Sequence, residues 1–131
     1  MNIEIVFFTP PELGLIVQTE PTSVTVLDAA PYNTFSIVCT ASLPANVTAT
    51  KSFVWRLGPS GTGTVLTSSE DTSITTLNLG SATSTSVLTT NASSPGLSVY
   101  TCDVTVLSSL SSAATTVVVN GMSIIAVRSL S

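Results

Sequence analysis

The sequence contains no histidine, only three basic residues, and a charged fraction of 8%. Without histidine, a serine or cysteine nucleophile has no imidazole base to accept its proton. Lys51 is the single lysine, and we expect it in an exposed loop. These absences exclude the common forms of acid-base and nucleophilic catalysis. We therefore expect that this chain is not an enzyme, although a longer protein that contained it could carry a kinase elsewhere.

The scarcity of charge also narrows the range of ligands. The formal net charge is −4, and the three basic residues are too scattered to neutralise several phosphates, so we expect no nucleic-acid partner. Glu70 and Asp71 are the only adjacent carboxylates; because they lie in a predicted solvated loop, we expect no metal site. The glycine-rich stretch 58–63 lacks the Gly-Lys-Ser/Thr ending of a phosphate-binding loop, and we expect no cofactor.

Long apolar runs are missing as well. No stretch reaches about 18 uninterrupted apolar residues, the length that a membrane span requires. Glu4 stands where a signal peptide would have basic residues, and Pro10 and Pro11 interrupt the first apolar run, so we read no secretion signal. We expect one domain over residues 16–120. Residues 1–15 and 121–131 are then extensions or linkers, and a secretory origin would make this chain a piece of a longer protein.

What the sequence does contain is a hydrophobic spacing of two residues and many Val, Ile and Thr side chains. Both features suit half-buried, pleated strands, so the pattern predicts an all-β domain. Turn residues such as Gly, Pro, Asn and Asp separate the apolar stretches. The expected strands are Ser23–Leu27, Thr34–Ala41, Ser52–Leu57, Thr64–Thr67, Ser73–Leu79, Thr85–Thr90, Leu97–Leu107 and Ala114–Asn120. Seven or eight short strands with such turns predict a sandwich or a barrel.

Three of these strands each present a bulky face to the same side. Alternation aligns Cys39 with Phe35 and Ile37, and Cys102 with Tyr100 and Val104. The third strand aligns Trp55 with Phe53 and Leu57. Both cysteines thus point into the core. A reactive thiol would need a basic neighbour, and a zinc site would need further ligands, and the sequence supplies neither.

The order Cys39, Trp55, Leu88 and Tyr100-x-Cys102 resembles the immunoglobulin superfamily over residues 16–120. The resemblance implies a Greek-key sandwich of two antiparallel sheets in which a Cys39–Cys102 disulfide joins the sheets. It also implies a core built on Ile37, Trp55, Leu88 and Tyr100. Gly96 stands where many members have an aspartate four residues before the tyrosine, so the ion pair of variable-like domains cannot form and the set stays open. The Tyr100 hydroxyl is still expected to bond back to the backbone near 91–96.

The resemblance also implies where the protein acts. Domains of this kind, together with the sequons at Asn46 and Asn91, indicate an extracellular, glycosylated module of a membrane-anchored cell-surface protein. The Ser/Thr/Val-rich style further resembles tandem ectodomain modules of early-branching animals, such as a sponge receptor tyrosine kinase or adhesion molecule. The expected activity is protein recognition, with a weak homodimer as one form of it. The alternative is a passive spacer between other domains.

A binding face is predicted on the side of two strands that points away from the core. Alternation with Trp55 and Cys102 places five residues there, and we expect them to be exposed. They are Val54, Arg56, Thr101, Asp103 and Thr105.

Overall fold

The computed structural model describes residues 14–44, 47, 49–92 and 95–121, and it contains nine strands. Among these residues no helix is long and apolar enough to cross a membrane. Asn46 lies outside the described residues. The strands are β1 (Ile16–Glu20), β2 (Ser23–Leu27), β3 (Thr34–Ser42), β4 (Lys51–Leu57), β5 (Thr64–Val65), β6 (Ser73–Leu77), β7 (Thr83–Asn91), β8 (Gly96–Val106) and β9 (Ser109–Asn120).

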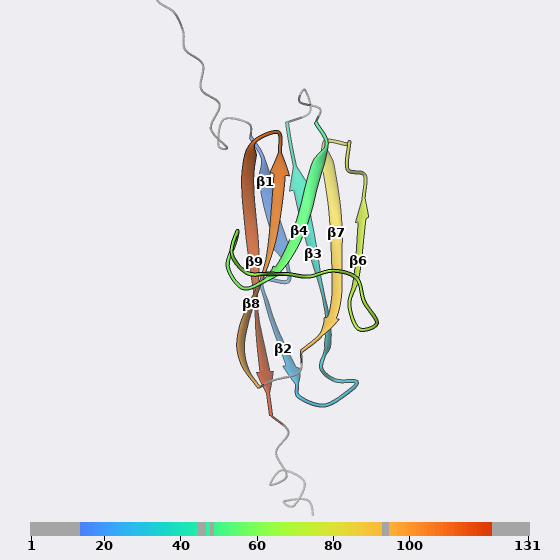
Figure 1. The fold of residues 1–131 in the computed structure, drawn as a ribbon, viewed down its shortest axis with the longest axis vertical. Coiled ribbons are helices and arrows are strands. Elements are labelled where there is room, and N and C mark those ends of the chain that lie inside the picture. Colours follow the sequence, from blue (N-terminus) through green and yellow to red (C-terminus); the bar gives the residue numbers. More distant parts are fainter. Residues whose placement is uncertain (1–13, 45–46, 48, 93–94, 122–131) are drawn as a thin grey trace, which may run out of the picture.

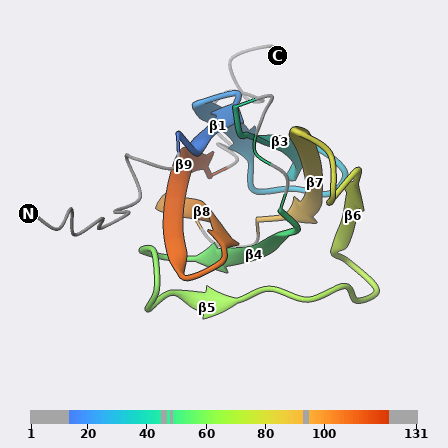
Figure 2. The same cartoon turned by 90° about the horizontal axis from the view of Figure 1, so that it is seen from above.

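The strands form two facing sheets (Figures 1 and 2). One has four strands in the order β1-β3-β7-β6, and the other has five in the order β2-β9-β8-β4-β5. All neighbours are antiparallel except β2 and β9, which pair in parallel. The predicted all-β sandwich of two sheets is therefore confirmed. Strands β1 and β2 lie on the side where the two sheets approach each other, and β5 and β6 lie on the opposite side (Figure 2).

The first strand, β1, was not predicted as a strand. It pairs with β3, and after Pro21 and Thr22 the chain crosses to the other sheet, where β2 pairs with β9. The segment Ile16–Glu20 has a weak apolar alternation, so its pairing depends on the tertiary context. Strand β9 also begins five residues earlier than the expected Ala114, because the serine-rich segment from Ser109 pairs with β8 across a two-residue turn.

The inter-sheet disulfide is present, as predicted. Cys39 of β3 and Cys102 of β8 are bonded, with a Cα–Cα distance of 6.5 Å, and both are fully buried. Trp55 stands opposite Cys102 in the sheet register, and Leu88 stands opposite Ile37. All four side chains are buried. The core thus forms where β3, β4, β7 and β8 face one another.

Lys51 is not in an exposed loop, contrary to expectation. It is the first residue of β4 and only 1% exposed. Because it shares the alternation of Phe53 and Trp55, its stem enters the interior between the sheets. The ammonium group donates to the carbonyl oxygen of Ser81 and to Oγ of Ser84 at 3.0 Å. Burial away from water disfavours the charged form and lowers the pKa of Lys51 below its usual 10.5.

The inner face of β7 carries serines whose hydroxyl groups accept hydrogen bonds from side chains of β4, in the other sheet. Ser84 accepts from Lys51 and donates to the carbonyl oxygen of Asn78 at 2.6 Å. Ser86 accepts from Nε1 of Trp55 at 2.9 Å. Buried hydroxyls without partners would destabilise the fold by about 1 to 3 kcal/mol each, so these bonds are needed wherever β7 has serine instead of an apolar residue.

We expect the double variant Cys39→Ala, Cys102→Ala to lose about 4 kcal/mol of unfolding free energy, because a cross-link across this span restricts the unfolded chain. The two residues are 63 positions apart in the sequence. Urea unfolding followed by tryptophan fluorescence measures the difference. Thr25→Ala, an exposed change on β2, is the control. A loss no larger than that of the control would contradict the prediction.

The burial of Lys51 predicts a stability that rises with pH. Since its pKa is lower in the folded state than 10.5, the unfolded chain binds more protons between the folded pKa and 10.5. The unfolding free energy of the wild type, relative to Lys51→Met, should therefore increase as the pH rises from neutrality toward that value. Urea unfolding of both proteins over a pH series tests this. Tyr100, whose pKa burial raises, is present in both and cancels in the difference; a flat or falling difference would contradict the prediction.

Candidate protein-binding face

The outer face of the five-stranded sheet contains all five residues of the predicted binding site. In the register of β4 and β8, Arg56 stands opposite Thr101, and Val54 stands opposite Asp103. Thr105 follows on the same side of β8. The alternation that sends Trp55 and Cys102 into the core therefore does place these residues together on one outer face. Whether each is accessible depends on what covers it.

Asp103 is not an exposed position, which corrects the prediction. It is only 3% exposed, because the loop between β4 and β5 folds across β8 above it. Its carboxylate accepts from Nε of Arg56 at 2.9 Å, from Oγ of Ser60 at 2.6 Å and from the backbone N–H of Gly61 at 2.9 Å. Arg56 also donates to the carbonyl oxygen of Gly63 at 2.9 Å. Asp103 and Arg56 thus clamp the loop to the face.

Thr101 is likewise buried, contrary to expectation. Its hydroxyl donates to the carbonyl oxygen of Gly58 at 2.7 Å, so it faces the start of the same loop. The loop turns back tightly between Gly58 and Gly63. A Cβ on Gly63 would lie 2.8 Å from the carbonyl oxygen of Leu57, a distance that only glycine avoids. The glycine-rich stretch therefore forms a turn between β4 and β5, and it also covers the middle of the face.

The accessible parts of the face lie beyond this loop. Val54, Arg56 and Thr105 are half-buried. Leu97 is 69% exposed near the start of β8, with Val99 two residues further on and Val118 opposite Leu97 on β9. We call Leu97, Val99 and Val118 the apolar patch. The prediction did not include it, although Leu97 and Val99 have the same alternation as Thr101 and could have been found that way.

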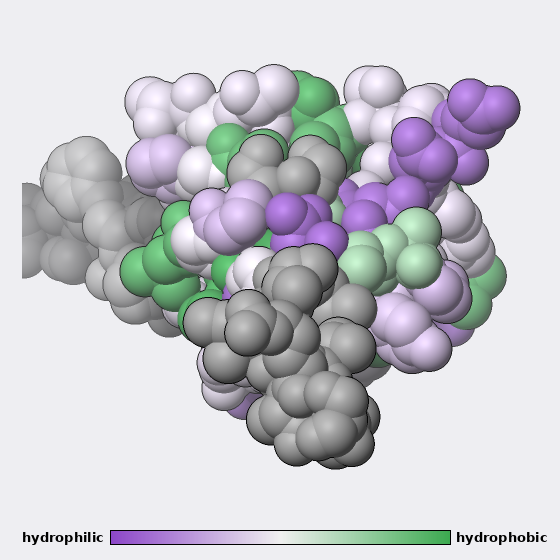
Figure 3. Space-filling view, turned by 90° about the horizontal axis from the view of Figure 1, so that it is seen from below, coloured by the Kyte–Doolittle hydropathy of each residue, from purple (hydrophilic) through white to green (hydrophobic). Residues whose placement is uncertain are grey.

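The surface of the lower end of the sandwich is mostly pale and weakly polar (Figure 3). Apolar areas appear there as separate patches, and strongly hydrophilic groups gather toward one side. This distribution follows from a chain whose polarity comes from hydroxyl groups and whose charged fraction is 8%. Partner contact on such a surface requires little desolvation of charge.

The sequon residue Asn91 is the last residue of β7 and is exposed. Its Oδ1 accepts from the hydroxyl of Thr34 at 2.8 Å, which leaves the amide nitrogen, the site of glycan attachment, outside that bond. Glycosylation stays a prediction. The Tyr100 ring packs edge-on against Phe35 at 5.1 Å between centroids. The expected bond from its hydroxyl to the backbone near 91–96 stays a prediction, because residues 93 and 94 lie outside the described residues.

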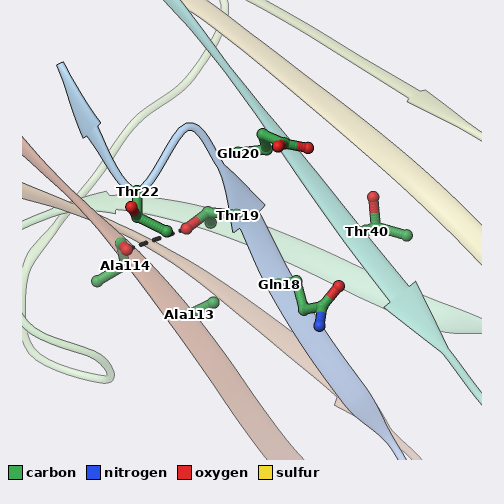
Figure 4. Close-up of a pocket in the computed structure, with 7 residues that line it drawn as sticks. All are labelled: Gln18, Thr19, Glu20, Thr22, Thr40, Ala113 and Ala114. Carbon is green, nitrogen blue, oxygen red and sulfur yellow. Dashed lines mark hydrogen bonds between the residues drawn. The ribbon is translucent and has the colours of Figure 1, made fainter.

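A recess of about 360 Å³ lies where β1 approaches β9 (Figure 4). Thr19 and Thr22 lie on the side facing β9, and the Thr19 hydroxyl donates to the carbonyl oxygen of Ala114 at 3.0 Å. Glu20 is the only charged residue of its lining. Within the described part of the chain no three His, Cys, Asp or Glu side chains gather in a group that could hold a metal ion. The recess thus offers a small polar surface of hydroxyl, amide and carboxylate groups.

Comparison with solved structures identifies the fold. No protein-family model matches the sequence, and no curated protein matches it. Among solved structures, the M1 domain from titin is similar at a TM-score of 0.54 and 17% identity, covering 80% of this chain and 93% of that one. The chain has an immunoglobulin-like fold.

Two further structures are similar to this chain in fold. In a mutant complex of titin M10 with an obscurin-like 1 immunoglobulin domain, the matched chain has a TM-score of 0.50 and 24% identity, with 77% of this chain and 87% of that one covered. A family 123 glycoside hydrolase from Clostridium perfringens contains a similar region at a TM-score of 0.56 and 8% identity. This chain spans only 27% of that enzyme.

We expect Asp103→Ala to release the loop between β4 and β5. The change leaves Arg56 without its carboxylate partner and should lower the unfolding free energy by about 2 to 4 kcal/mol. Hydrogen exchange at the Gly61 amide should accelerate, because that N–H loses its acceptor. Urea unfolding and exchange mass spectrometry measure the two effects. Thr105→Ala, on the same face of the same strand, is the control; unchanged exchange at Gly61 in Asp103→Ala would contradict the clamp.

Proposed function

We propose that this chain is a non-catalytic, extracellular immunoglobulin-like module of a cell-surface receptor, and that it acts in protein recognition, including self-association. The observation that carries the proposal is the apolar patch. Leu97, Val99 and Val118 adjoin one another outside a core that is complete without them. Adjoining apolar side chains on an otherwise hydroxyl-rich surface favour contact with another protein.

The extracellular setting draws its support from the disulfide. A bond between Cys39 and Cys102 persists in oxidising compartments, and the sequons at Asn46 and Asn91 fit the same setting. Membrane anchoring, and a sponge receptor tyrosine kinase or adhesion molecule as the longer protein, belong to this proposal through the sequence resemblance. In the titin M10 complex the two partners are titin M10 and an obscurin-like 1 immunoglobulin domain, which supports association between like folds.

A passive spacer is the second candidate, and one observation favours it. The loop clamped by Asp103 covers the middle of the face on which such modules would meet a partner. A domain that covers this face with its own loop fits a role in which it holds neighbouring domains apart. The two candidates differ in one measurable property, which is association.

Sedimentation equilibrium of the oxidised domain over a wide range of concentrations distinguishes them. A recognition module that self-associates should show a reversible dimer with a dissociation constant between about 1 μM and 1 mM. Mass spectrometry after alkylation, without reduction, verifies that the disulfide is intact in the sample. A protein that stays monomeric at the highest concentration would overturn self-association.

A further inference from the structure

The two sheets have four edge strands, and three of them are very short or are partly bonded to neighbouring segments. β1 is tied to β9 by the bond from Thr19 to Ala114. β2 contacts β3 of the facing sheet, and the backbone N–H of its last residue, Leu27, is bonded to the carbonyl oxygen of Tyr32. β5 has only two residues. Short length and cover are two ways in which proteins prevent pairing between edges.

The fourth edge strand, β6, is open. Within the described part of the chain it pairs with β7 alone, and it lies at the outer margin of the sandwich (Figures 1 and 2). Its sequence, Ser73–Leu77, contains no charge, no proline and no glycine. Ser73 and Thr75 are exposed, and Leu77 is 54% exposed. An uncharged strand of Ile, Thr and Leu residues with a free backbone edge favours pairing with another strand.

The pleat restricts how a second copy of β6 could pair with the first. In an antiparallel pair, opposed residues must lie on the same face of the joint sheet, and side chains alternate between faces. A residue therefore can oppose only one whose number has the same parity. All five residues pair only when Thr75 opposes Thr75 of the second copy, with Ser73 then opposite Leu77. Any other register leaves part of the strand without a partner.

Charge selects the antiparallel arrangement. Glu70 and Asp71, both exposed, precede β6. In a parallel pair in register, each carboxylate would lie beside its own copy, which is repulsive. In the antiparallel pair centred on Thr75, Asp71 of one copy reaches Leu79 of the other, and Glu70 reaches Gly80. The acidic residues of the two copies are then separated by the length of the paired strands.

We propose that two copies of this chain associate through β6, in antiparallel register centred on Thr75, so that their four-stranded sheets join into one. This inference rests on the proposed function, because it requires self-association; it assigns that association to β6 rather than to the apolar patch, which lies on the other sheet. The interface is a single short strand pair with little side-chain burial, well below the size of a stable dimer interface. The dimer is accordingly weak and forms where the local concentration is high, as on a cell surface.

Charge reversal at Thr75 tests the register. Thr75 is exposed and faces outward, so Thr75→Glu and Thr75→Lys should fold with unfolding midpoints close to that of the wild type. In each variant alone, like charges meet at the centre of the dimer and should weaken association at least about tenfold. An equimolar mixture of the two variants should restore it. Thr25→Glu, the same change at the centre of the five-residue edge strand β2, should associate like the wild type.

Sedimentation equilibrium of the oxidised proteins reads all of these outcomes. If the wild type dimerises and Thr75→Glu dimerises equally, the β6 interface is overturned while self-association stands. If both variants are weakened but their mixture is not restored, the register centred on Thr75 is overturned. If Thr25→Glu is weakened as much as Thr75→Glu, the effect is general repulsion and the interface is overturned. A wild type that stays monomeric at every concentration overturns both the interface and self-association.

Discussion

The two-residue period of β8 is the constraint on which most of this structure depends. It sends Tyr100, Cys102 and Val104 into the core and Thr101 and Asp103 to the outer face. The disulfide to Cys39 then holds β8 to the opposite sheet, and the bonds of Asp103 hold the loop between β4 and β5 to the outside. Strand β8 thus holds the two sheets together through its inner face and holds the loop between β4 and β5 through its outer face. A shift of its register by one residue would exchange the two sets and lose both.

The same alternation explains why the interior is partly polar. β4 brings Lys51 and Trp55 to the inner face, and β7 brings Ser84 and Ser86 to meet them. These bonds have defined partners and directions, whereas apolar contacts alone would tolerate sliding of one sheet over the other. The buried ammonium group is held by neutral oxygens, so its charge is stabilised by hydrogen bonds and opposed by desolvation. Polar bonds across the core therefore help to define how the sheets align.

The burial of a side chain could be predicted from the sequence where it depends on which face of a strand the residue lies on. It could not be predicted where it depends on the path of a loop. The all-β sandwich follows from alternation, and the pairing of Cys39 with Cys102 follows from the resemblance. Lys51 has the parity of Trp55, so its burial could have been predicted had the strand been extended by one residue. The burial of Asp103 could not have been predicted, because it depends on how far the segment 58–63 folds back across β8. The pairing of β1 could not be predicted either, because strand alternation does not show that the chain crosses between the sheets at Pro21 and Thr22.

The scarcity of charge links the fold to its surfaces. In many β-sandwiches charged side chains on edge strands prevent pairing between molecules. In the described residues the single ion pair is between Arg56 and Asp103. It holds the loop between β4 and β5 in place, and this loop covers the centre of a sheet face. With few other charges available, β6 has none along its length, and Glu70 and Asp71 stand only at its beginning. Because β6 has no charged side chains, its open edge can pair with another strand through backbone hydrogen bonds rather than through charge complementarity.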